Sequence, residues 1–341
     1  MRLQENVSLA DHSTMRLGGQ ARYLTEVSKP EEVAEAAAWA KSNNLPLIII
    51  GRGSNIIWRD EGFDGLVIVN KLAGREVISE DDHSMTVKFA AGENWDKAVA
   101  WTVDKKLNGI EFMSLVPGTV GAAPVQNVGA YGGELSVTLL ELEAYDTSVS
   151  SIVRLQNHDC GFSYRSSRFK TTDKNRFLIL SVTLTLRKSN PVPPFYEPLQ
   201  AYLDANGIDK YTPKTIREAV VAIRQSKLPD PEKVSNNGSF FTNPFVDKVK
   251  YDELRQKYPD IKGWPAGDKV KLAAGWLVEK AGFKGYHDPQ TGMATWPNQA
   301  LVLVNENARS TADLIAFRQK ILDAVQLMFG VTLAQEPEIL P

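Results

Sequence analysis

Three polar side chains lie in sequence contexts that could stabilise a negative charge or move a proton. Arg165 follows Tyr164, and an arginine can clamp a carboxylate with two parallel hydrogen bonds. Ser239 can donate a proton where a neighbouring group stabilises its alkoxide. No Gly-x-Ser-x-Gly pattern surrounds it, so a hydrolase nucleophile is not indicated. Glu338 ends a Glu-Pro-Glu segment. Taken singly, each residue favours an ordinary structural interpretation: a solvated strand end for Arg165, a turn for Ser239 and a frayed tail for Glu338.

A glycine-rich turn follows the apolar run Leu45–Ile50. It reads Gly51-Arg52-Gly53-Ser54-Asn55, and Ile56 stands where a dinucleotide fingerprint needs a third small residue. A hydride carrier in a Rossmann fold is therefore disfavoured. Successive backbone N–H groups in such a turn can still hold a phosphate, and an ordinary tight turn remains an equal alternative.

A second glycine-rich segment covers residues 115–133 and is apolar, poor in charge and without a regular period. It lacks the Gly-Lys-Ser/Thr ending of a P-loop. Because small residues let a ligand approach the backbone, the segment suits a flat apolar ring joined to a pyrophosphate. Long loops of this kind are usually functional, so ligand binding is favoured over a purely structural loop.

The composition limits the remaining choices. The chain has 341 residues, a net charge of −2 and an isoelectric point near 6.2, which gives little support to a nucleic-acid partner. Its one cysteine, Cys160, cannot form an internal disulfide, and its four histidines show no metal-ligand spacing, so we expect no metal site. No apolar leader or membrane-length run is visible, so we expect a cytoplasmic protein with no membrane partner.

The elements that must position these residues follow from local patterns. We expect α-helices over the ranges 30–41, 95–105, 216–225, 251–258, 272–281 and 311–329, the last capped by Thr311 and closed by Gly330. We expect strands over 45–50, 66–70, 85–91, 139–145, 177–186, 301–305 and 331–333. The four prolines between Ser189 and Pro198 are typical of a connection between domains.

Eight segments in this order resemble the UDP-N-acetylenolpyruvoylglucosamine reductase family. They are GRGSN (51–55), VPGTVGAAPVQNVGAYG (116–132), FSYRSSRFK (162–170), KLPDP (227–231), NGSFFTNP (237–244), KLAAGWLVEKAG (271–282), QALVLVN (299–305) and EPEI (336–339). Tyr196 and the spacer around it resemble the longer of the family's two subtypes. Each segment alone is weak evidence, but the ordered set is specific.

The resemblance implies an α+β fold, with an FAD-binding region of the vanillyl-alcohol-oxidase (PCMH) type in two subdomains and a C-terminal α+β substrate domain. The implied boundaries are 1–70 and 71–215 for the two subdomains, with the FAD-binding region at about 16–187, then 216–330 for the substrate domain and 331–341 for a returning strand and tail.

The resemblance also implies a list of contacts. Non-covalent FAD would be bound by Gly51, Arg52, Gly53, Ser54, Asn55, Pro117, Gly118, Thr119, Gly121, Ala122, Gln126, Asn127, Gly129, Ala130, Tyr131 and Tyr164. The UDP-sugar would be bound by Tyr196, Lys227, Asn243 and Gln299.

The implied reaction is one step in making the bacterial cell wall. NADPH would reduce the flavin, which would then pass hydride to the enolpyruvyl carbon of a UDP-sugar. Arg165 would stabilise the resulting enolate, Glu338 would position or polarise its carboxylate, and Ser239 would give the proton. We expect a monomer that needs only small-molecule partners.

Two departures and two alternatives remain. Ser163 replaces a usual glycine, which should reduce backbone freedom before Tyr164, and Ser166 replaces a common aspartate. An FAD oxidase of the same architecture is the main alternative, although no histidine for a covalent flavin link lies in either glycine-rich segment. A non-catalytic flavin or UDP-sugar regulator is the other, but it would have no need of a proton donor.

Overall fold

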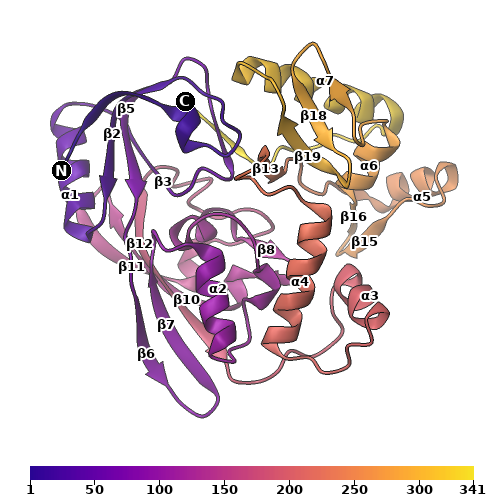
Figure 1. Ribbon diagram of the computed structural model, residues 1–341, viewed down its shortest axis with the longest axis horizontal. Helices are drawn as coiled ribbons and strands as arrows, with labels where there is room; N and C mark the ends of the chain where they lie inside the picture. The colour runs from indigo at the N-terminus through magenta and orange to yellow at the C-terminus, as the bar shows by residue number, and fades with distance from the viewer. The chain divides into compact units, whose positions relative to one another are not determined.

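The computed structural model describes residues 1–341, which form two compact units (Figure 1). The first unit comprises Met1–Val7, Ala21–Arg52 and Asp64–Gln225, and the second comprises Ser8–Gln20, Gly53–Phe63 and Ser226–Pro341. The chain thus passes from one unit to the other inside the first glycine-rich turn. The division at residues 70, 215 and 330 expected from the sequence stays a prediction.

The first sheet of the first unit ends, at one edge, in a pair of parallel strands. Its strand order is β1 (Gln4–Ser8), β2 (Gln20–Val27), β5 (Phe63–Asn70) and β3 (Leu47–Ile50). Helix α1 (Pro30–Ser42) packs Val33, Ala36 and Ala40 against Leu66 and Ile68. The helix begins at a proline, where a backbone N–H is not needed, and Glu32 accepts hydrogen bonds from the N–H groups of Ser28 and Lys29 at 2.7 and 3.2 Å. The predicted helix is confirmed.

The second sheet is antiparallel, and its central strand is buried on both faces while its two edge strands are largely exposed. Its order is β11 (Ser151–Gln156), β10 (Leu139–Asp146), β12 (Phe177–Arg187), β7 (Ser84–Ala90) and β6 (Arg75–Glu80). From β12, Ile179, Val182 and Leu184 share a core with helix α2 (Trp95–Asp104), while Leu178 and Leu180 pack in the core of α1. Burial on both faces explains why β12 is almost continuously apolar.

The segment at 115–133 is a buried irregular loop, as expected. It and its flanks contain the 3-10 turns η2 (Glu111–Met113), η3 (Val120–Gln126) and η4 (Leu135–Val137) and the short strands β8 (Gly129–Ala130) and β9 (Gly133–Glu134). Val120, Ala123 and Val128 are buried in the core of α2, and the N–H of Gly121 donates to the carbonyl of Ala91 at 2.8 Å. The loop is therefore fixed to the sheet rather than free.

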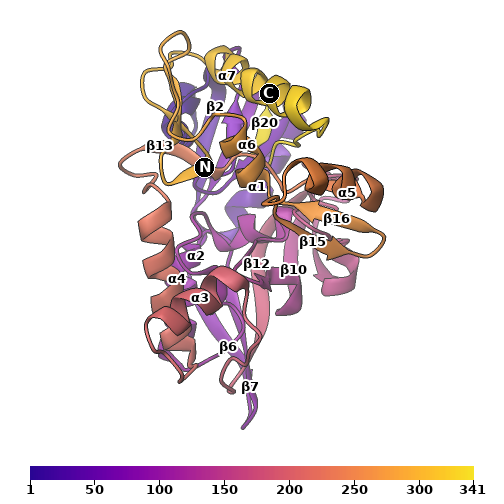
Figure 2. The ribbon, with the colours of Figure 1, turned by 90° about the vertical axis from the view of Figure 1, so that its right-hand side faces the viewer.

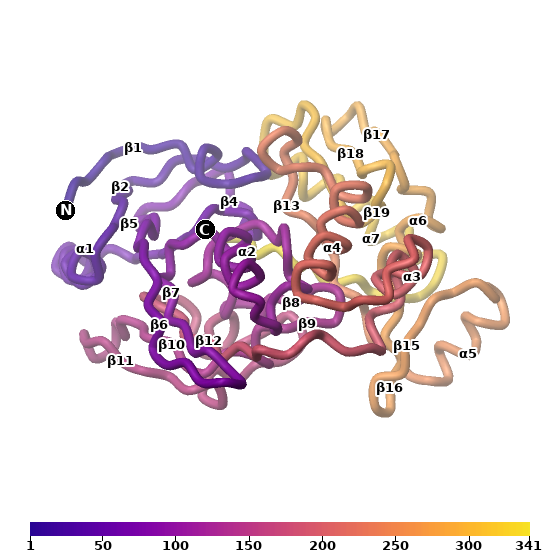
Figure 3. Tube along the Cα trace, turned by 60° about the horizontal axis from the view of Figure 1, so that its bottom comes forward, coloured from indigo at the N-terminus to yellow at the C-terminus, as the bar shows by residue number.

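Two more helices complete the first unit. After β12 the chain runs through the proline-rich segment to α3 (Glu197–Ala205) and then α4 (Pro213–Lys227), as the trace in Figure 3 shows. Leu199 and Leu203 of α3 pack against Ile216, Val220 and Ile223 of α4. Figure 2 shows α4 beside α2. The proline-rich segment thus lies inside the first unit and does not connect the two units, contrary to the expectation from its four prolines.

The second unit combines two small sheets with three helices. The sheets have the orders β13 (Ser235–Ser239), β19 (Gln299–Asn305), β18 (Met293–Trp296), β17 (His287–Asp288), and β14 (Phe245–Asp247), β16 (Lys269–Leu272), β15 (Gly263–Ala266). The helices are α5 (Lys248–Lys257), α6 (Ala274–Lys280) and α7 (Thr311–Phe329). They enclose one apolar core, to which α7 contributes Leu314, Phe317 and Ile321. No helix of the protein is both long and apolar enough to cross a membrane.

The two ends of α7 differ in how well they were predicted. Gly330 closes the helix with φ +64°, as expected. The N-cap is Ser310 and not Thr311, because the Ser310 hydroxyl accepts the N–H of Asp313, whereas the Thr311 hydroxyl donates to the carbonyl of Trp58 at 2.6 Å.

The strand predicted at 331–333 is wrong. Val331 and Leu333 are buried in the core of the second unit, so their apolar side chains are accounted for without any strand pairing. The C-terminal strand is instead β20 (Glu338–Leu340), which pairs in parallel with β4 (Ile56–Trp58).

Replacement of Gly121 tests how tightly the loop is fixed. A Cβ at this position would lie 2.4 Å from the Cβ of Ala91, so Gly121→Ala should lower the unfolding free energy by about 1–3 kcal/mol in chemical denaturation. The double variant Ala91→Gly/Gly121→Ala moves the methyl group across the contact and should recover part of the loss. Equal stability of the single variant and the unchanged protein would contradict the close approach.

Candidate functional site

In the first unit, the two predicted glycine-rich segments meet. A Cβ at Gly51 would lie 2.4 Å from the hydroxyl oxygen of Thr119, so glycine is needed there for the turn to approach the loop. The structure thereby brings Gly51, which follows β3, against Thr119 of the loop that carries the other residues predicted for cofactor binding. Those loop residues are Pro117, Gly118, Thr119, Gly121, Ala122, Gln126, Asn127, Gly129, Ala130 and Tyr131. Arg52 directly follows Gly51, whereas Gly53, Ser54 and Asn55 belong to the second unit.

Asn127 locks the loop to the segment that carries Arg165. Its amide nitrogen donates to Glu134 at 3.2 Å and to the carbonyl of Ser163 at 3.3 Å, and its side-chain oxygen accepts the N–H of Ser136 at 3.0 Å. With φ +46°, Asn127 also ends the 3-10 turn η3 in the left-handed region that asparagine tolerates. Its buried amide therefore holds the loop in shape.

A two-residue turn presents Arg165. The backbone of Ser163 and Ser166 exchanges two hydrogen bonds of 3.0 and 3.1 Å, and Arg165 takes φ +53° at the tip. The residue with a left-handed backbone is thus Arg165 and not Ser163, so the serine at 163 meets no strain of that kind. The guanidinium of Arg165 donates to the carbonyl of Gly129 at 2.7 Å, which fixes it beside the loop.

Three tyrosines gather at the same place. The rings of Tyr131 and Tyr196 meet edge to face with centroids 6.3 Å apart, and the guanidinium of Arg165 lies 5.3 Å from the ring centroid of Tyr164. Burial raises the pKa of both Tyr131 and Tyr196, so both phenols stay protonated at neutral pH. The first unit therefore offers flat aromatic faces beside a fixed cation.

In the second unit, backbone pairing brings Ser239 and Glu338 together. The N–H of Glu336 donates to the carbonyl of Phe240 at 2.9 Å, directly after Ser239. Glu338 is paired with Ile56 across β20 and β4, and its N–H donates to the carbonyl of Asn55 at 3.0 Å. Two of the three residues predicted to be catalytic are thus held by one framework, while Arg165 belongs to the other unit.

Two consecutive side-chain hydrogen bonds hold the segment before Glu338. Arg318 of α7 donates to the side-chain oxygen of Gln335 at 2.8 Å, and the amide nitrogen of Gln335 donates to the carbonyl of Pro337 at 2.7 Å. The sequence prediction missed both residues, because they lie 17 positions apart and their types carry no motif.

Asn237 is a second residue that the prediction missed, although it adjoins the Gly238-Ser239 motif. Its amide nitrogen donates to the Thr14 hydroxyl at 3.2 Å and to the carbonyl of Ile56 at 3.3 Å. It therefore ties β13 to β4, the strand that pairs with Glu338. Its buried side-chain oxygen has no hydrogen-bond partner.

Two residues predicted to bind substrate lie at the start of α6. The side-chain oxygen of Asn243 accepts the N–H of Ala274 at 2.9 Å, and a Cβ at Gly275 would lie 3.1 Å from the side-chain oxygen of Gln299. Lys227 is exposed, and the carbonyl of its neighbour Ser226 accepts a hydrogen bond of 3.1 Å from Asn298, next to Gln299 in the chain. The second unit therefore places Asn243 and Gln299 at the start of α6, and Lys227 beside the turn that leads into β19.

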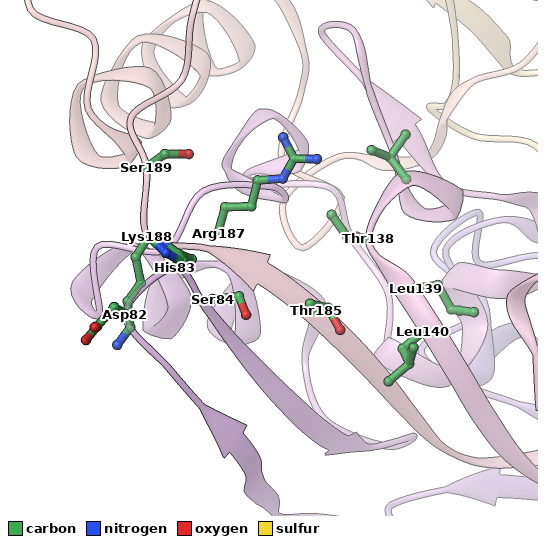
Figure 4. A pocket seen from close by; sticks show the side chains of 11 residues that line it. Asp82, His83, Ser84, Thr138, Leu139, Leu140, Thr185, Arg187, Lys188 and Ser189 are labelled. Carbon is green, nitrogen blue, oxygen red and sulfur yellow. The ribbon is translucent and has the colours of Figure 1, made fainter.

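Other features of the first unit lie away from the predicted residues. A pocket of about 510 Å³ between the β6–β7 turn and the start of β10 contains none of them, as Figure 4 shows.

Cys160 is buried, and burial raises its pKa to about 12, so its thiol is not reactive at neutral pH.

Comparisons with known proteins agree with this arrangement. Residues 21–156 match the model of an FAD binding domain, and residues 230–340 match the UDP-N-acetylenolpyruvoylglucosamine reductase, C-terminal domain. The chain is 40% identical to the UDP-N-acetylenolpyruvoylglucosamine reductase of Pseudomonas aeruginosa over 340 residues, which cover 99% of both chains. It is also 40% identical to that of Burkholderia multivorans over 332 residues, covering 96% of this chain and 94% of the relative.

The chain belongs to the UDP-N-acetylenolpyruvoylglucosamine reductase family. It is an FAD-dependent oxidoreductase, as the resemblance implied. The solved structure of the reductase from Thermus caldophilus matches all of both chains with a TM-score of 0.67 at 23% identity, which confirms the expected fold.

A buried carboxyl group beside the loop should make this reductase sensitive to pH. Glu111 is fully buried, one of its oxygens has no partner, and burial raises its pKa from 4.5 to about 7. Because the folded state resists ionisation of this group, the contribution of Glu111 to stability should be largest below about pH 4.5 and should be lost as the pH rises through 7, by about 3 kcal/mol.

The variant Glu111→Gln removes this ionisation. The loss of unfolding free energy between about pH 4.5 and pH 8 should therefore be smaller in the variant than in the unchanged protein, as measured by urea denaturation at each pH. Exposed Glu76→Gln is the matched control. An identical pH dependence in Glu111→Gln and the unchanged protein would refute the ionisable role of Glu111.

Gln335 should act as a positioning residue. Gln335→Glu keeps an acceptor for Arg318 but loses the donor to Pro337, so we expect kcat of the reductase to fall about 10- to 100-fold while bound flavin is unchanged. Gln319→Glu, on the exposed side of α7, is the matched control. Full activity of Gln335→Glu would show that Pro337 needs no such support.

Proposed function

We propose that this protein reduces UDP-N-acetylenolpyruvoylglucosamine to UDP-N-acetylmuramate, with FAD as bound cofactor and NADPH as co-substrate, in peptidoglycan precursor synthesis. The observation that carries the proposal is the match over 99% of the chain to a reductase of this name. The backbone bond between Glu336 and Phe240, which ties the segment of Glu338 to that of Ser239, supports it. The reaction adds one hydride and one proton across the enol-ether double bond and oxidises NADPH to NADP⁺.

The residues of the first unit fit FAD. When bound, FAD would supply the hydride chemistry that links NADPH to the terminal carbon of the enolpyruvyl group. Three tyrosines and a loop of small residues suit a flat ring, and a Cβ at Gly132 would have only Tyr196 within contact, at 3.7 Å. Gly51 and the loop residues from Pro117 to Tyr131 would hold the cofactor through their backbone groups, as the resemblance implies.

Arg165 supplies the positive charge for the reaction. Negative charge develops on the carbon next to the substrate carboxylate after hydride addition, and a fixed cation stabilises such a charge most in a dry site. The hydrogen bond to Gly129 holds the guanidinium in place before the substrate binds, so little reorganisation is needed at the moment of reaction.

Ser239 gives the proton to that carbon. A serine hydroxyl is a weak acid in water, and it becomes effective only within hydrogen-bond reach of a strongly basic carbanion. Ser239 ends β13, where its backbone is paired opposite Val302. The preceding Gly238 has φ +69° and open space around it, which leaves room for a substrate beside the serine.

Glu338 positions or polarises the substrate carboxylate. It lies on β20, and its N–H is bonded to Asn55. Lys227 would neutralise phosphate, the amides of Asn243 and Gln299 would bind polar atoms of the sugar nucleotide, and Tyr196 would contact it from the first unit. We further propose that the protein acts as a monomer in the cytoplasm, where NADPH and UDP-sugars are available.

The test is to record the two half-reactions of the flavin separately by stopped-flow absorbance. The purified protein should be yellow and should oxidise NADPH continuously only when the enolpyruvyl UDP-sugar is present. Ser239→Ala should keep flavin reduction by NADPH but slow flavin reoxidation by the UDP-sugar by at least about 1,000-fold. Exposed Ser189→Ala is the matched control.

Other results would contradict the proposal. Rapid reoxidation by oxygen without the UDP-sugar would favour an oxidase, and a colourless protein that still binds UDP-sugars would favour a regulator. Equal slowing of both half-reactions in Ser239→Ala would remove the serine from the role of proton donor.

A further inference from the structure

The guanidinium of Arg224 has a donor that no group of the first unit accepts. The residue lies in the last turn of α4 and is partly buried. Its Nη2 donates to the carbonyl of Leu115 at 3.2 Å, while its enclosed Nε has no hydrogen-bond partner. Because an enclosed donor without a partner destabilises the folded protein, Nε of Arg224 points to a group that binds there.

The carboxylate whose charge acts on Arg224 is Asp96, and it is not free to bond to this cation. Both its oxygens accept hydrogen bonds from Arg217, at 2.6 and 3.0 Å. One of these oxygens also accepts the N–H of Leu115 at 2.6 Å. Burial opposes ionisation of Asp96, but the hydrogen bonds from Arg217 and Leu115 hold its pKa below the usual range. Asp96 is therefore already paired with these two residues.

Arg224 and Asp96 together clamp the start of the glycine-rich loop. Leu115 has φ +56°, a conformation that is costly for a bulky residue, and its N–H and C=O are held by Asp96 and Arg224 respectively. The clamp explains one donor of Arg224. It leaves Nε and the positive charge without a structural purpose, because a lysine could also donate to one carbonyl.

The charge of Arg224 acts on the cluster of predicted ligand-binding residues. It lies close enough to Tyr131 to oppose the rise in pKa that burial causes there. Tyr131 in turn packs against Tyr196. A cation with a spare donor therefore borders the place where aromatic faces and the loop backbone converge.

We propose that Arg224 is a further ligand-binding residue, whose Nε and guanidinium charge bind an oxygen of an anionic or electron-rich group of a molecule held by the first unit. This inference rests on the proposed function for the identity of the molecule. Two groups share the required chemistry: the carbonyl-bearing pyrimidine edge of the flavin, which gains negative charge on reduction, and the carboxylate or diphosphate of the UDP-sugar.

The variants Arg224→Lys and Arg224→Met separate the two functions of this side chain. Lysine retains the charge and one donor for Leu115 but lacks Nε, and methionine lacks both. The measurements are the dissociation constant of FAD from reconstituted apoprotein, the midpoint potential of the bound flavin, and KM for the UDP-sugar. Arg187→Lys, in the pocket of Figure 4, is the matched control.

If the flavin is the ligand, Arg224→Lys should weaken FAD binding by about 10- to 100-fold, and Arg224→Met should also lower the midpoint potential of the flavin. If the UDP-sugar is the ligand, KM should rise by a similar factor while the dissociation constant and potential stay unchanged. Either pattern supports the proposal and identifies the source of the bound group.

Wild-type values for all three quantities in Arg224→Lys would overturn the proposal, since the lysine variant still holds Leu115 and should fold. Failure of the proposed function is a separate result, because it would appear as a lack of UDP-sugar-dependent turnover in the unchanged protein. The FAD dissociation constant and potential test Arg224 whether or not that turnover is found.

Discussion

The backbone pairing of residues 335–340 is the constraint on which the rest of the site depends. This segment carries Glu338, and it makes one ladder with β4 and further hydrogen bonds with the residues that follow Ser239. Each of these bonds satisfies a backbone group that would otherwise need water. Because the side chains of a strand are placed by its register, the pairing fixes where Glu338 lies relative to Ser239 inside the second unit. Gln335 and Asn237 reinforce this register from either side.

In the first unit, the constraint is different: a long loop of small residues that has no regular structure must be held in place. Glycines allow close approach, as at Gly51 and Gly121, but they provide no side chain that could fix the loop. Fixing is done by polar side chains from neighbouring segments that bond to the loop backbone: Asp96 and Arg224 at Leu115, and Arg165 at Gly129. In Arg165 and Arg224 the same side chain that supports the loop also brings positive charge to it. Structural support and positive charge are thus combined in single residues.

Much of the fold follows from local rules that a sequence displays. Pro30 with Glu32 marks a helix start, Gly330 marks a helix end, and the apolar run of β12 marks a strand buried on both faces. Rules of this kind fail where tertiary packing decides between equally apolar options. Val331 and Leu333 look like strand residues, yet they are buried by side-chain packing alone, and the paired strand is β20. The motifs located Arg165, Ser239 and Glu338, but no local rule finds the ion pair of Asp96 with Arg217, 121 residues away.

The central claim is that the segment carrying Glu338 is a fixed strand in the free protein. Amide hydrogen exchange followed by mass spectrometry of peptides covering residues 334–341 tests this most directly. We expect the amides of Glu336 and Glu338 to exchange as slowly as those of β19 in the core of the second unit, because both donate hydrogen bonds to backbone carbonyls. Exchange at the rate of an unstructured peptide would contradict it.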